Sequence, residues 1–221
     1  MARFQFLLSL IAAILLVSCN TGPKKTKDGE TLVEITTNMG KMTVKLYNST
    51  PKHRDNFIKL VKEGYYNELL FHRVINGFMI QGGDPHSKNA APGAMLGGGG
   101  PDYNIEPEFG RKHFKGVLAA ARLSDAQNPR KRSSGSQFYI VQGRPVSSSD
   151  LQGFAAQKGI QYTQEEINKY AQVGGAPFLD NEYTAFGEVV DGLEVIDKIA
   201  AVRTNEANRP EQDIRMQIKL L

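Results

Sequence analysis

The 221-residue sequence predicts a mainly β fold in which an antiparallel sheet closes on itself and two helices accompany it. Short runs of β-branched and aromatic residues recur along the chain, and turns rich in Gly, Pro and Asn separate them. This spacing favours a closed antiparallel sheet over an α/β sandwich. The runs lie at residues 70–74, 78–81, 116–121, 138–141 and 186–190.

The first predicted element is a β-hairpin. From Thr31 the chain alternates between polar and apolar residues, so that Val33 and Ile35 share one face. A turn follows at residues 38–40, and residues 42–46 alternate again. This pattern is typical of two antiparallel strands joined by a short loop.

Two helices are predicted outside the strand-rich regions. Thr50 and Pro51 form an N-cap and first-turn signature, and the apolar stripe behind them predicts a helix that ends near Glu63. A second stripe over residues 193–199 predicts another helix, and residues 214–220 alternate as a last strand. No internal repeat interrupts this order.

Residues 147–176 break the rhythm of short strands and are predicted to be an insertion. The segment opens with a polar stretch, and Thr163 with Glu166 then forms a capping box. A helix is expected over residues 164–172, ending before two glycines. Its apolar stripe includes Tyr170, so the insertion should pack against the main domain.

The N-terminus has the layout of a secretory signal. Arg3 precedes an uncharged apolar run over residues 4–17, which is too short for a comfortable membrane span. The run ends in Leu-Val-Ser-Cys, which resembles the bacterial lipobox, where the chain is cut before a lipidated cysteine. We therefore expect a signal peptide over residues 1–18 and a lipid on Cys19. This predicts a location in the bacterial cell envelope, facing the periplasm or the cell surface.

Cys19 is the only cysteine of the chain. The alternative interpretation is an incidental thiol within the leader. On either interpretation the domain can form no internal disulfide, so its stability must come from its core. The polar residues 19–30 are interpreted as a tether, and residues 31–221 as the folded domain.

Composition limits the other classes of function. With 40% hydrophobic residues the chain can bury the core of one compact domain, and its formal charge of +4 is spread along the sequence. Nucleic acid is therefore not an expected partner. The four histidines show no ligand spacing, so we expect neither a metal nor another cofactor.

Two other candidate motifs have simpler interpretations. The glycines at 97–100 lack the Lys-Ser/Thr that follows in a phosphate-binding loop, which favours a glycine-rich loop over the sheet. Ser133, Ser134 and Ser136 have no evident base in the sequence, so a serine nucleophile is not predicted.

The segment FHRVINGFMIQGGD, residues 71–84, carries the strongest functional pattern. On a strand, Met79 and Gln81 share one face, so a polar amide would lie beside a large apolar side chain. The pattern alone also allows a simpler interpretation, in which Arg73 is an exposed strand charge and Gln81 lies on a rim.

This segment closely resembles the signature of the cyclophilins, and two later segments resemble that family's next blocks in the same order. They are SSGSQFYIVQG at residues 133–143 and FLDNEYTAFGEV at residues 178–189. The resemblance covers residues 31–221 apart from the insertion. It implies an eight-stranded antiparallel barrel with a helix over each end, and an outer groove that binds X-Pro segments.

The resemblance also assigns roles to matched positions. It implies that Arg73 is the catalytic cation and Gln81 its polar partner. The implied substrate-binding residues that match the family directly are Phe78, Met79, Ala121, Gln137 and Leu179. Four others depart from its usual pattern: Arg122 replaces Asn, Tyr139 replaces Phe, Phe178 replaces Trp and Tyr183 replaces His. Phe178 bears on cyclosporin, the cyclic peptide known to occupy this family's groove.

The function implied is peptidyl-prolyl cis/trans isomerisation without a cofactor, and the leader makes exported, proline-containing polypeptides the expected substrates. The sequence carries no pattern for the oligomeric state, so a monomer is the default expectation. Two alternatives belong to other classes. The groove could serve a non-catalytic proline-binding module or holdase, or the insertion helix could serve an envelope scaffold. Arg73 favours the enzyme, because docking of proline needs aromatic walls but no cation.

Overall fold

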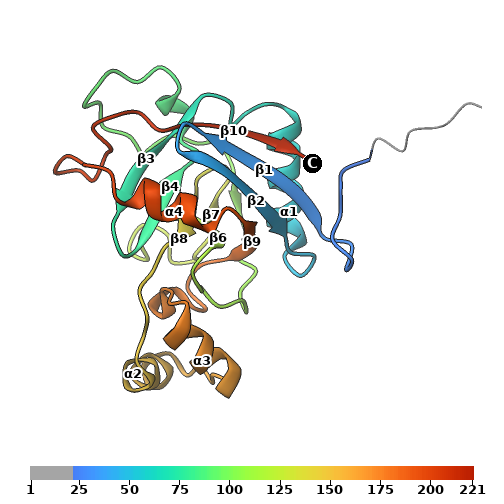
Figure 1. Cartoon of the computed structure of the whole chain (residues 1–221), viewed down its shortest axis with the longest axis vertical. Helices are drawn as coiled ribbons and strands as arrows, with labels where there is room; N and C mark the ends of the chain where they lie inside the picture. The colour runs from blue at the N-terminus through green and yellow to red at the C-terminus, as the bar shows by residue number, and fades with distance from the viewer. Residues whose placement is uncertain (1–21) are drawn as a thin grey trace, which may run out of the picture.

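The structure is a computed structural model, and it describes residues 22–221. These residues form a closed antiparallel barrel in the order β1-β10-β3-β4-β8-β6-β9-β2 (Figure 1), which confirms the predicted fold class. Two short strands pair beside it, β5 (Asn104–Ile105) with β7 (Ser133–Ser134). The barrel strands are β1 (Thr31–Thr37), β2 (Gly40–Leu46), β3 (Leu69–Ile75), β4 (Met79–Gly82), β6 (Val117–Ala120), β8 (Phe138–Val141), β9 (Ala185–Asp191) and β10 (Arg215–Leu220). The predicted signal peptide and Cys19 lie outside the described residues.

The barrel is filled by one face of each strand. The predicted hairpin is confirmed, because β1 and β2 pair with Val33 opposite Val44 and Ile35 opposite Met42. These four side chains are fully buried in the barrel core. The intervening residues face outward, as the alternation of the sequence predicted.

Two helices close the same core. Helix α1 (Pro51–Lys62) contributes Phe57 and Leu60, and α4 (Leu193–Ala200) contributes Ile196. Both helices were predicted from their apolar stripes. Helix α1 ends one residue earlier than expected.

The N-terminus of α1 is not capped as predicted. Thr50 makes no side-chain capping bond. Instead, the Glu108 carboxylate accepts hydrogen bonds from the backbone N–H groups of Lys52 and His53, both at 3.1 Å. A carboxylate at this position satisfies unpaired donors and interacts favourably with the helix dipole. Because Glu108 lies far away in the sequence, no local pattern revealed it.

The insertion contains two helices, and only the second was predicted. Helix α3 (Gln164–Gln172) has the expected bounds and the Thr163–Glu166 capping box. Helix α2 (Ser148–Lys158) occupies the stretch interpreted as polar, and Ser147 caps it by accepting from the backbone N–H of Asp150 at 3.1 Å. In Figure 1 the two helices lie at the bottom of the view, outside the barrel.

A buried carboxylate fastens the insertion to the main domain. Asp180 is fully buried and accepts hydrogen bonds from the hydroxyls of Tyr162, at 2.9 Å, and Tyr170, at 2.7 Å. It also accepts from the backbone N–H and the ring Nδ1–H of His113. The insertion therefore packs against the domain, as the stripe with Tyr170 predicted.

Part of the predicted tether is not a free linker. Lys25 forms a β-bridge with Thr31, and the carbonyl of Lys24 accepts from the N–H of Leu32 at 3.0 Å. The N–H of Lys24 in turn donates to the carbonyl of Leu221. Folded structure thus begins several residues before the expected boundary. Among residues 22–221, no helix is long and apolar enough to cross a membrane.

Candidate active site

A cavity of about 640 Å³ opens on the outer face of the barrel. Its lining comes from β3, β4 and β8, from the loop after η1 (Pro85–Ser87), and from η2 (Pro177–Leu179). Nearly all of the catalytic and substrate-binding residues implied by the resemblance lie here. They are Arg73, Phe78, Met79, Gln81, Ala121, Arg122, Tyr139, Phe178, Leu179 and Tyr183.

A β-bulge directs two neighbouring residues into this cavity. Phe71 pairs with Gly82 and Arg73 pairs with Gln81, so β3 has one extra residue, His72. Consequently His72 and Arg73 both line the cavity, whereas Phe71 and Val74 both enter the barrel core. Strict alternation would have placed His72 and Arg73 on opposite faces.

A chain of side-chain hydrogen bonds fixes the polar edge of the cavity. Arg73 Nη1 donates to Gln81 Oε1 at 3.1 Å, and Gln81 Nε2 donates to Gln137 Oε1 at 3.0 Å. Gln137 Nε2 donates to the carbonyls of Gly97 and Gly99, at 2.9 and 2.7 Å. No carboxylate among residues 22–221 forms an ion pair with Arg73. Its guanidinium is therefore oriented, while its charge is not neutralised.

Gln137 occupies a different place from the other predicted residues. It does not line the main cavity but an adjacent hollow of about 410 Å³. Gln81, Ala121 and Arg122 line both spaces. Gln137 therefore acts on the site through its hydrogen bond with Gln81, and it lines the adjacent hollow.

Apolar side chains form the floor of the cavity. Met79, Tyr139 and Leu179 are buried in a cluster on the outside of the barrel. Phe138, between two outward-facing neighbours, enters the barrel core, as predicted from the alternation of Gln137 and Tyr139. The Tyr139 hydroxyl has no hydrogen-bond partner among the described residues, and burial raises the pKa of this phenol well above its ordinary value. Tyr139 is therefore neutral.

The rim carries the aromatic departures from the family pattern. Phe178 is 43% exposed, and its ring lies 5.3 Å from that of Phe78. The Arg122 guanidinium lies 4.4 Å from the centre of the Tyr183 ring, a cation–π geometry. Arg122 Nε also donates to the Glu182 carbonyl at 2.9 Å. Arg122 thus holds Tyr183 and the Glu182 backbone in place at the rim.

Glu182 connects this rim to the insertion. Its carboxylate pairs with Arg122, with Lys131 and with Lys158 from α2. Partial burial favours the neutral acid, but the hydrogen bonds from Lys131 and Lys158 keep the pKa of Glu182 below its ordinary value. The ionised carboxylate fastens the end of α2 beside the cavity.

The glycine-rich loop lies over a buried carboxylate. Asp84 is fully buried and accepts hydrogen bonds from the backbone N–H groups of His86, Gly97 and Gly99. A Cβ at Gly99 would lie 2.2 Å from Asp84 Oδ1, and Gly97 has φ +103°. A side chain is therefore disfavoured at Gly97 and Gly99, so these two glycines have a structural role that needs no bound phosphate.

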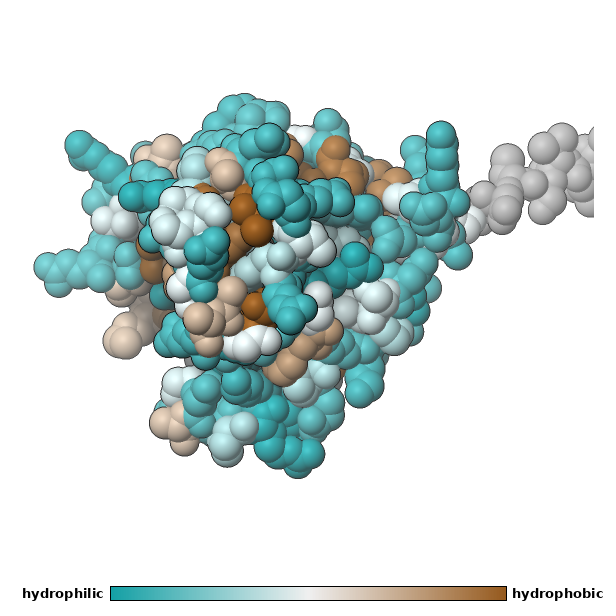
Figure 2. Space-filling view, turned by 90° about the horizontal axis from the view of Figure 1, so that it is seen from below, coloured by the Kyte–Doolittle hydropathy of each residue, from teal (hydrophilic) through white to brown (hydrophobic). Residues whose placement is uncertain are grey.

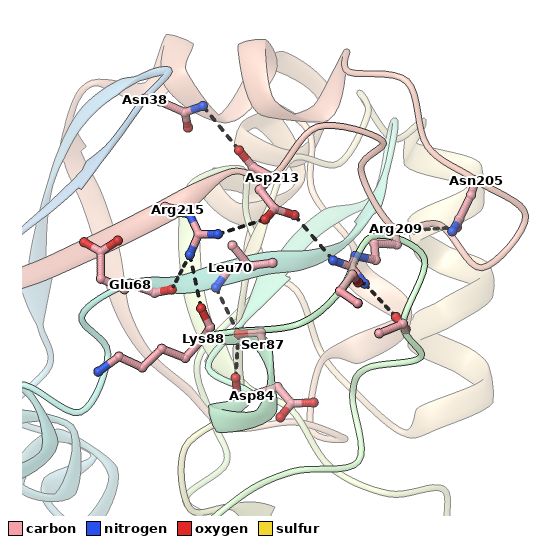
Figure 3. Close-up of polar contacts among 12 residues, drawn as sticks. Asn38, Glu68, Leu70, Asp84, Ser87, Lys88, Asn205, Arg209, Asp213 and Arg215 are labelled. Atoms are coloured by element: carbon pink, nitrogen blue, oxygen red, sulfur yellow. Dashed lines mark hydrogen bonds and ion pairs between the residues drawn. The ribbon is translucent and has the colours of Figure 1, made fainter.

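Arg209 holds the other end of this loop, a contact that no sequence pattern predicted. Its side chain is buried, and Nη1 donates to the carbonyls of Ala91 and Ala94, at 3.0 and 2.8 Å. Figure 3 shows Arg209 and Arg215 on either side of Asp213, which accepts from both. Arg209 and residues 93–97 line the cavity.

The expectation that Ser133 lacks a base is wrong. His53 Nε2 lies 2.9 Å from Ser133 Oγ, and His53 Nδ1 lies 2.7 Å from Glu108 Oε2. The groups follow the order of a nucleophilic triad, but His53 and Ser133 are only 1% and 2% exposed. The small cavity lined by His53 and Ser134 holds about 10 Å³, too little for a substrate. The array therefore ties α1 to β7.

His72 is a buried histidine that lines the cavity. Neither ring nitrogen has a hydrogen-bond partner among the described residues, and burial lowers its pKa to about 4. His72 is therefore neutral near pH 7. Within residues 22–221 no group of three or more His, Cys, Asp or Glu residues could hold a metal ion.

Comparisons with known proteins agree with this geometry. The sequence model of the family described as "Cyclophilin type peptidyl-prolyl cis-trans isomerase/CLD" matches residues 32–219. A Staphylococcus aureus protein is 36% identical over 192 residues, covering 86% of this chain and 91% of the relative. A Staphylococcus saprophyticus protein is 37% identical over 179 residues, covering 80% and 85%. Both relatives have names that place them among the peptidyl-prolyl cis-trans isomerases.

Solved structures show the same fold. The crystal structure of a cyclophilin-type peptidyl-prolyl cis-trans isomerase from Cryptosporidium parvum has a TM-score of 0.62 and 25% sequence identity, covering 87% of this chain and 98% of its own. A second structure from that organism, in the presence of the dipeptide Ala-Pro, has a TM-score of 0.61 and 26% identity. It covers 86% of this chain and 98% of its own.

The family match spans the whole barrel, from β1 to β10, and includes every strand that lines the cavity. The relatives cover most of the chain, so the match is not confined to one motif. The chain is a peptidyl-prolyl cis/trans isomerase and belongs to the cyclophilin-type family.

Proposed function

We propose that the cavity beside Arg73 isomerises X-Pro bonds in exported polypeptides, and that a lipid on Cys19 holds the enzyme at a membrane. One observation carries the catalytic part. Arg73 is oriented by Gln81 and has no ion pair within the described chain, and it lies beside an apolar pocket. The related structure determined with Ala-Pro supports an X-Pro ligand for this fold.

The reaction requires no bond to be broken. Rotation about the X-Pro bond is slow because amide resonance resists it, with a barrier of about 18–20 kcal/mol. In the twisted state the proline nitrogen is pyramidal, and its lone pair is no longer shared with the carbonyl. A group that binds this state more strongly than the planar amide lowers the barrier.

Arg73 is suited to that task. Its guanidinium keeps its charge at physiological pH and can donate an N–H to the lone pair as it develops. The Gln81 amide oxygen accepts from Nη1 of Arg73 and so orients the plane of the guanidinium. Because the groove is partly shielded from water, such an electrostatic contact is worth on the order of a few kcal/mol in the transition state.

The apolar floor would restrain the proline ring during rotation. Phe78, Met79 and Leu179 provide apolar walls, and Tyr139 belongs to the same buried cluster. Gln81, Ala121 and Gln137 lie on the side where the preceding carbonyl would swing. The ring is thus held while the rest of the peptide rotates.

The envelope location rests on the sequence of the leader. The apolar run before Cys19 has signal-peptide length and lipobox-like residues. Figure 1 shows that the described chain begins beside β1, away from α2 and α3. A lipid attached ahead of this segment would leave the insertion side of the domain accessible.

A protease-coupled isomerisation assay tests the proposal against a holdase. The protein, solubilised in detergent, should accelerate cis/trans exchange in a short X-Pro peptide at substoichiometric concentration. Suppression of aggregation without such acceleration would instead identify a non-catalytic binding module.

A further inference from the structure

A second open hollow, also of about 640 Å³, borders the proline cavity. Phe178 lines both spaces and therefore lies where they meet. The second hollow is bounded by α2 of the insertion, by residues 144–146 and by residues 175–177. Its apolar lining consists of Pro145, Val146, Phe154, Pro177 and Phe178.

A row of aromatic rings joins the two spaces. The ring of Phe78 lies 5.3 Å from that of Phe178, which lies 6.3 Å from that of Phe154. These two steps place Phe154 within about 12 Å of Phe78. An extended polypeptide rises about 3.3 Å per residue, so three to four residues span this distance. A chain whose proline contacts Phe78 can therefore place another side chain at Phe154.

Helix α2 is held in place while Phe154 remains accessible. Lys158 pairs with Glu182 at 3.2 Å, and Leu151 is the only residue of α2 that is buried. Phe154 is partly exposed, and Phe178 is its only aromatic partner among the described residues. A large apolar side chain that is positioned but not buried in a core is available to contact a ligand.

The hollow also contains a cation. Arg144 is exposed and lines the hollow, and it forms no ion pair with another residue of the chain from 22 to 221. An unpaired guanidinium beside apolar walls favours a peptide carbonyl next to an apolar side chain, whereas Asp150, which also lines the hollow, disfavours a carboxylate. The face that carries α2 and α3 is seen in Figure 2, where apolar atoms lie near the centre and hydrophilic residues surround them.

We propose that this hollow is an extended substrate subsite. It takes an aromatic or large aliphatic side chain of the same polypeptide, three to four residues from the proline that is isomerised. The inference rests on the proposed function, because the distance is counted from a proline against Phe78. The insertion thus gives the enzyme a preference for substrate residues outside the X-Pro dipeptide.

The test uses the full-length protein in detergent and three kinds of peptide. The first is a short X-Pro peptide that ends before the hollow. The second carries Phe four residues from the proline, placed before it in one peptide and after it in another. The third carries Ser at these positions. The quantity compared is kcat/KM of each Phe peptide divided by that of its Ser counterpart.

For the wild-type protein we expect a ratio of about five to ten for one of the two placements, mainly through KM. Phe154→Ser should reduce this ratio to about one, and the conservative Phe154→Tyr should retain it. Ala156→Ser is the matched control, because Ala156 is exposed on the same helix and lines neither hollow. It should leave the ratio unchanged.

The outcomes separate the subsite from the proposed function. Turnover of the short peptide with a wild-type ratio of one at both placements would overturn the subsite alone. A ratio that persists in a folded Phe154→Ser protein would also overturn it. Absence of turnover on every peptide would overturn the proposed function and the subsite together.

Discussion

Arg73 and Gln81 lie directly opposite each other on β3 and β4, and the guanidinium donates to the amide oxygen at 3.1 Å. Gln81 is itself held by Gln137, which is anchored to the loop backbone. The orientation of the cation therefore depends on β3, β4, the residue that precedes β8 and a loop, which are joined by hydrogen bonds between residues up to 56 positions apart.

Replacement of Arg73 tests the role of this cation. Arg73→Ala should lower turnover by about a hundredfold or more, in the range found when a key electrostatic donor is removed. Arg73→Lys keeps the positive charge but loses the planar guanidinium and its fixed N–H directions. Its turnover should therefore lie between those of Arg73→Ala and the wild-type protein. Thermal unfolding serves as the control for folding. Near-normal turnover in a folded Arg73→Ala protein would exclude the assigned role.

Local patterns predicted the elements that depend on their own residues. The hairpin from Thr31 follows from alternation, and α3 follows from its capping box and apolar stripe. Helix α2 was missed because it buries only Leu151 and so has no stripe to recognise. Periodicity indicates a helix only when one face packs on a core.

Most of the site residues that could be predicted are those within the three motif segments. The three motif segments contain half of the residues that line the cavity, and the other half lie in loops outside them. The bulge at His72 was not predictable, because register depends on the partner strand. The Arg209 contacts and the Glu108 cap join residues 55 or more positions apart, for which one sequence gives no local pattern.

Arg209 should act on substrate affinity through the loop it holds. Arg209→Ala removes the donors to Ala91 and Ala94, so we expect KM to rise several-fold while kcat changes little. The freed loop should also be cut faster by protease near Gly93. Arg203→Ala is the control, since Arg203 is exposed and does not line the cavity. An unchanged KM together with unchanged proteolysis would contradict a positioning role.

His72 should make the fold less stable in acid. Burial lowers its pKa from 6.5 to about 4, so the unfolded chain takes up a proton at higher pH than the folded one. The contribution of neutral His72 is complete above pH 6.5 and is lost as pH falls towards 4. At pH 4.5 the loss should be about 2–3 kcal/mol of unfolding free energy.

Denaturant titrations at pH 7 and pH 4.5 measure this effect. His72→Gln should reduce the difference in unfolding free energy between the two pH values. The exposed His86 provides the matched substitution, His86→Gln, which should leave the difference unchanged. If His72→Gln and the wild type lost the same stability in acid, the effect would belong to other groups, of which buried His53 is one.

Attachment of the protein to a membrane should depend on Cys19. Cys19→Ser should prevent acylation, and the protein should then leave the membrane fraction or retain its leader. Intact mass of the wild-type protein should show cleavage before Cys19 and the added mass of lipid. A wild-type chain without lipid in the membrane fraction would contradict the anchor.

Phe178 should weaken inhibition by cyclosporin. Its ring packs on Phe78 at the rim, so it retains the apolar face that an indole would provide at this position but lacks the indole N–H donor. A ligand carbonyl buried without that donor costs about 1–3 kcal/mol, or about ten- to a hundredfold in affinity. Substrate turnover should suffer less, because Arg73 and the proline pocket do not require the donor. Phe178→Trp should therefore strengthen inhibition more than it changes turnover, and tight inhibition of the unmodified protein in a titration would refute the argument.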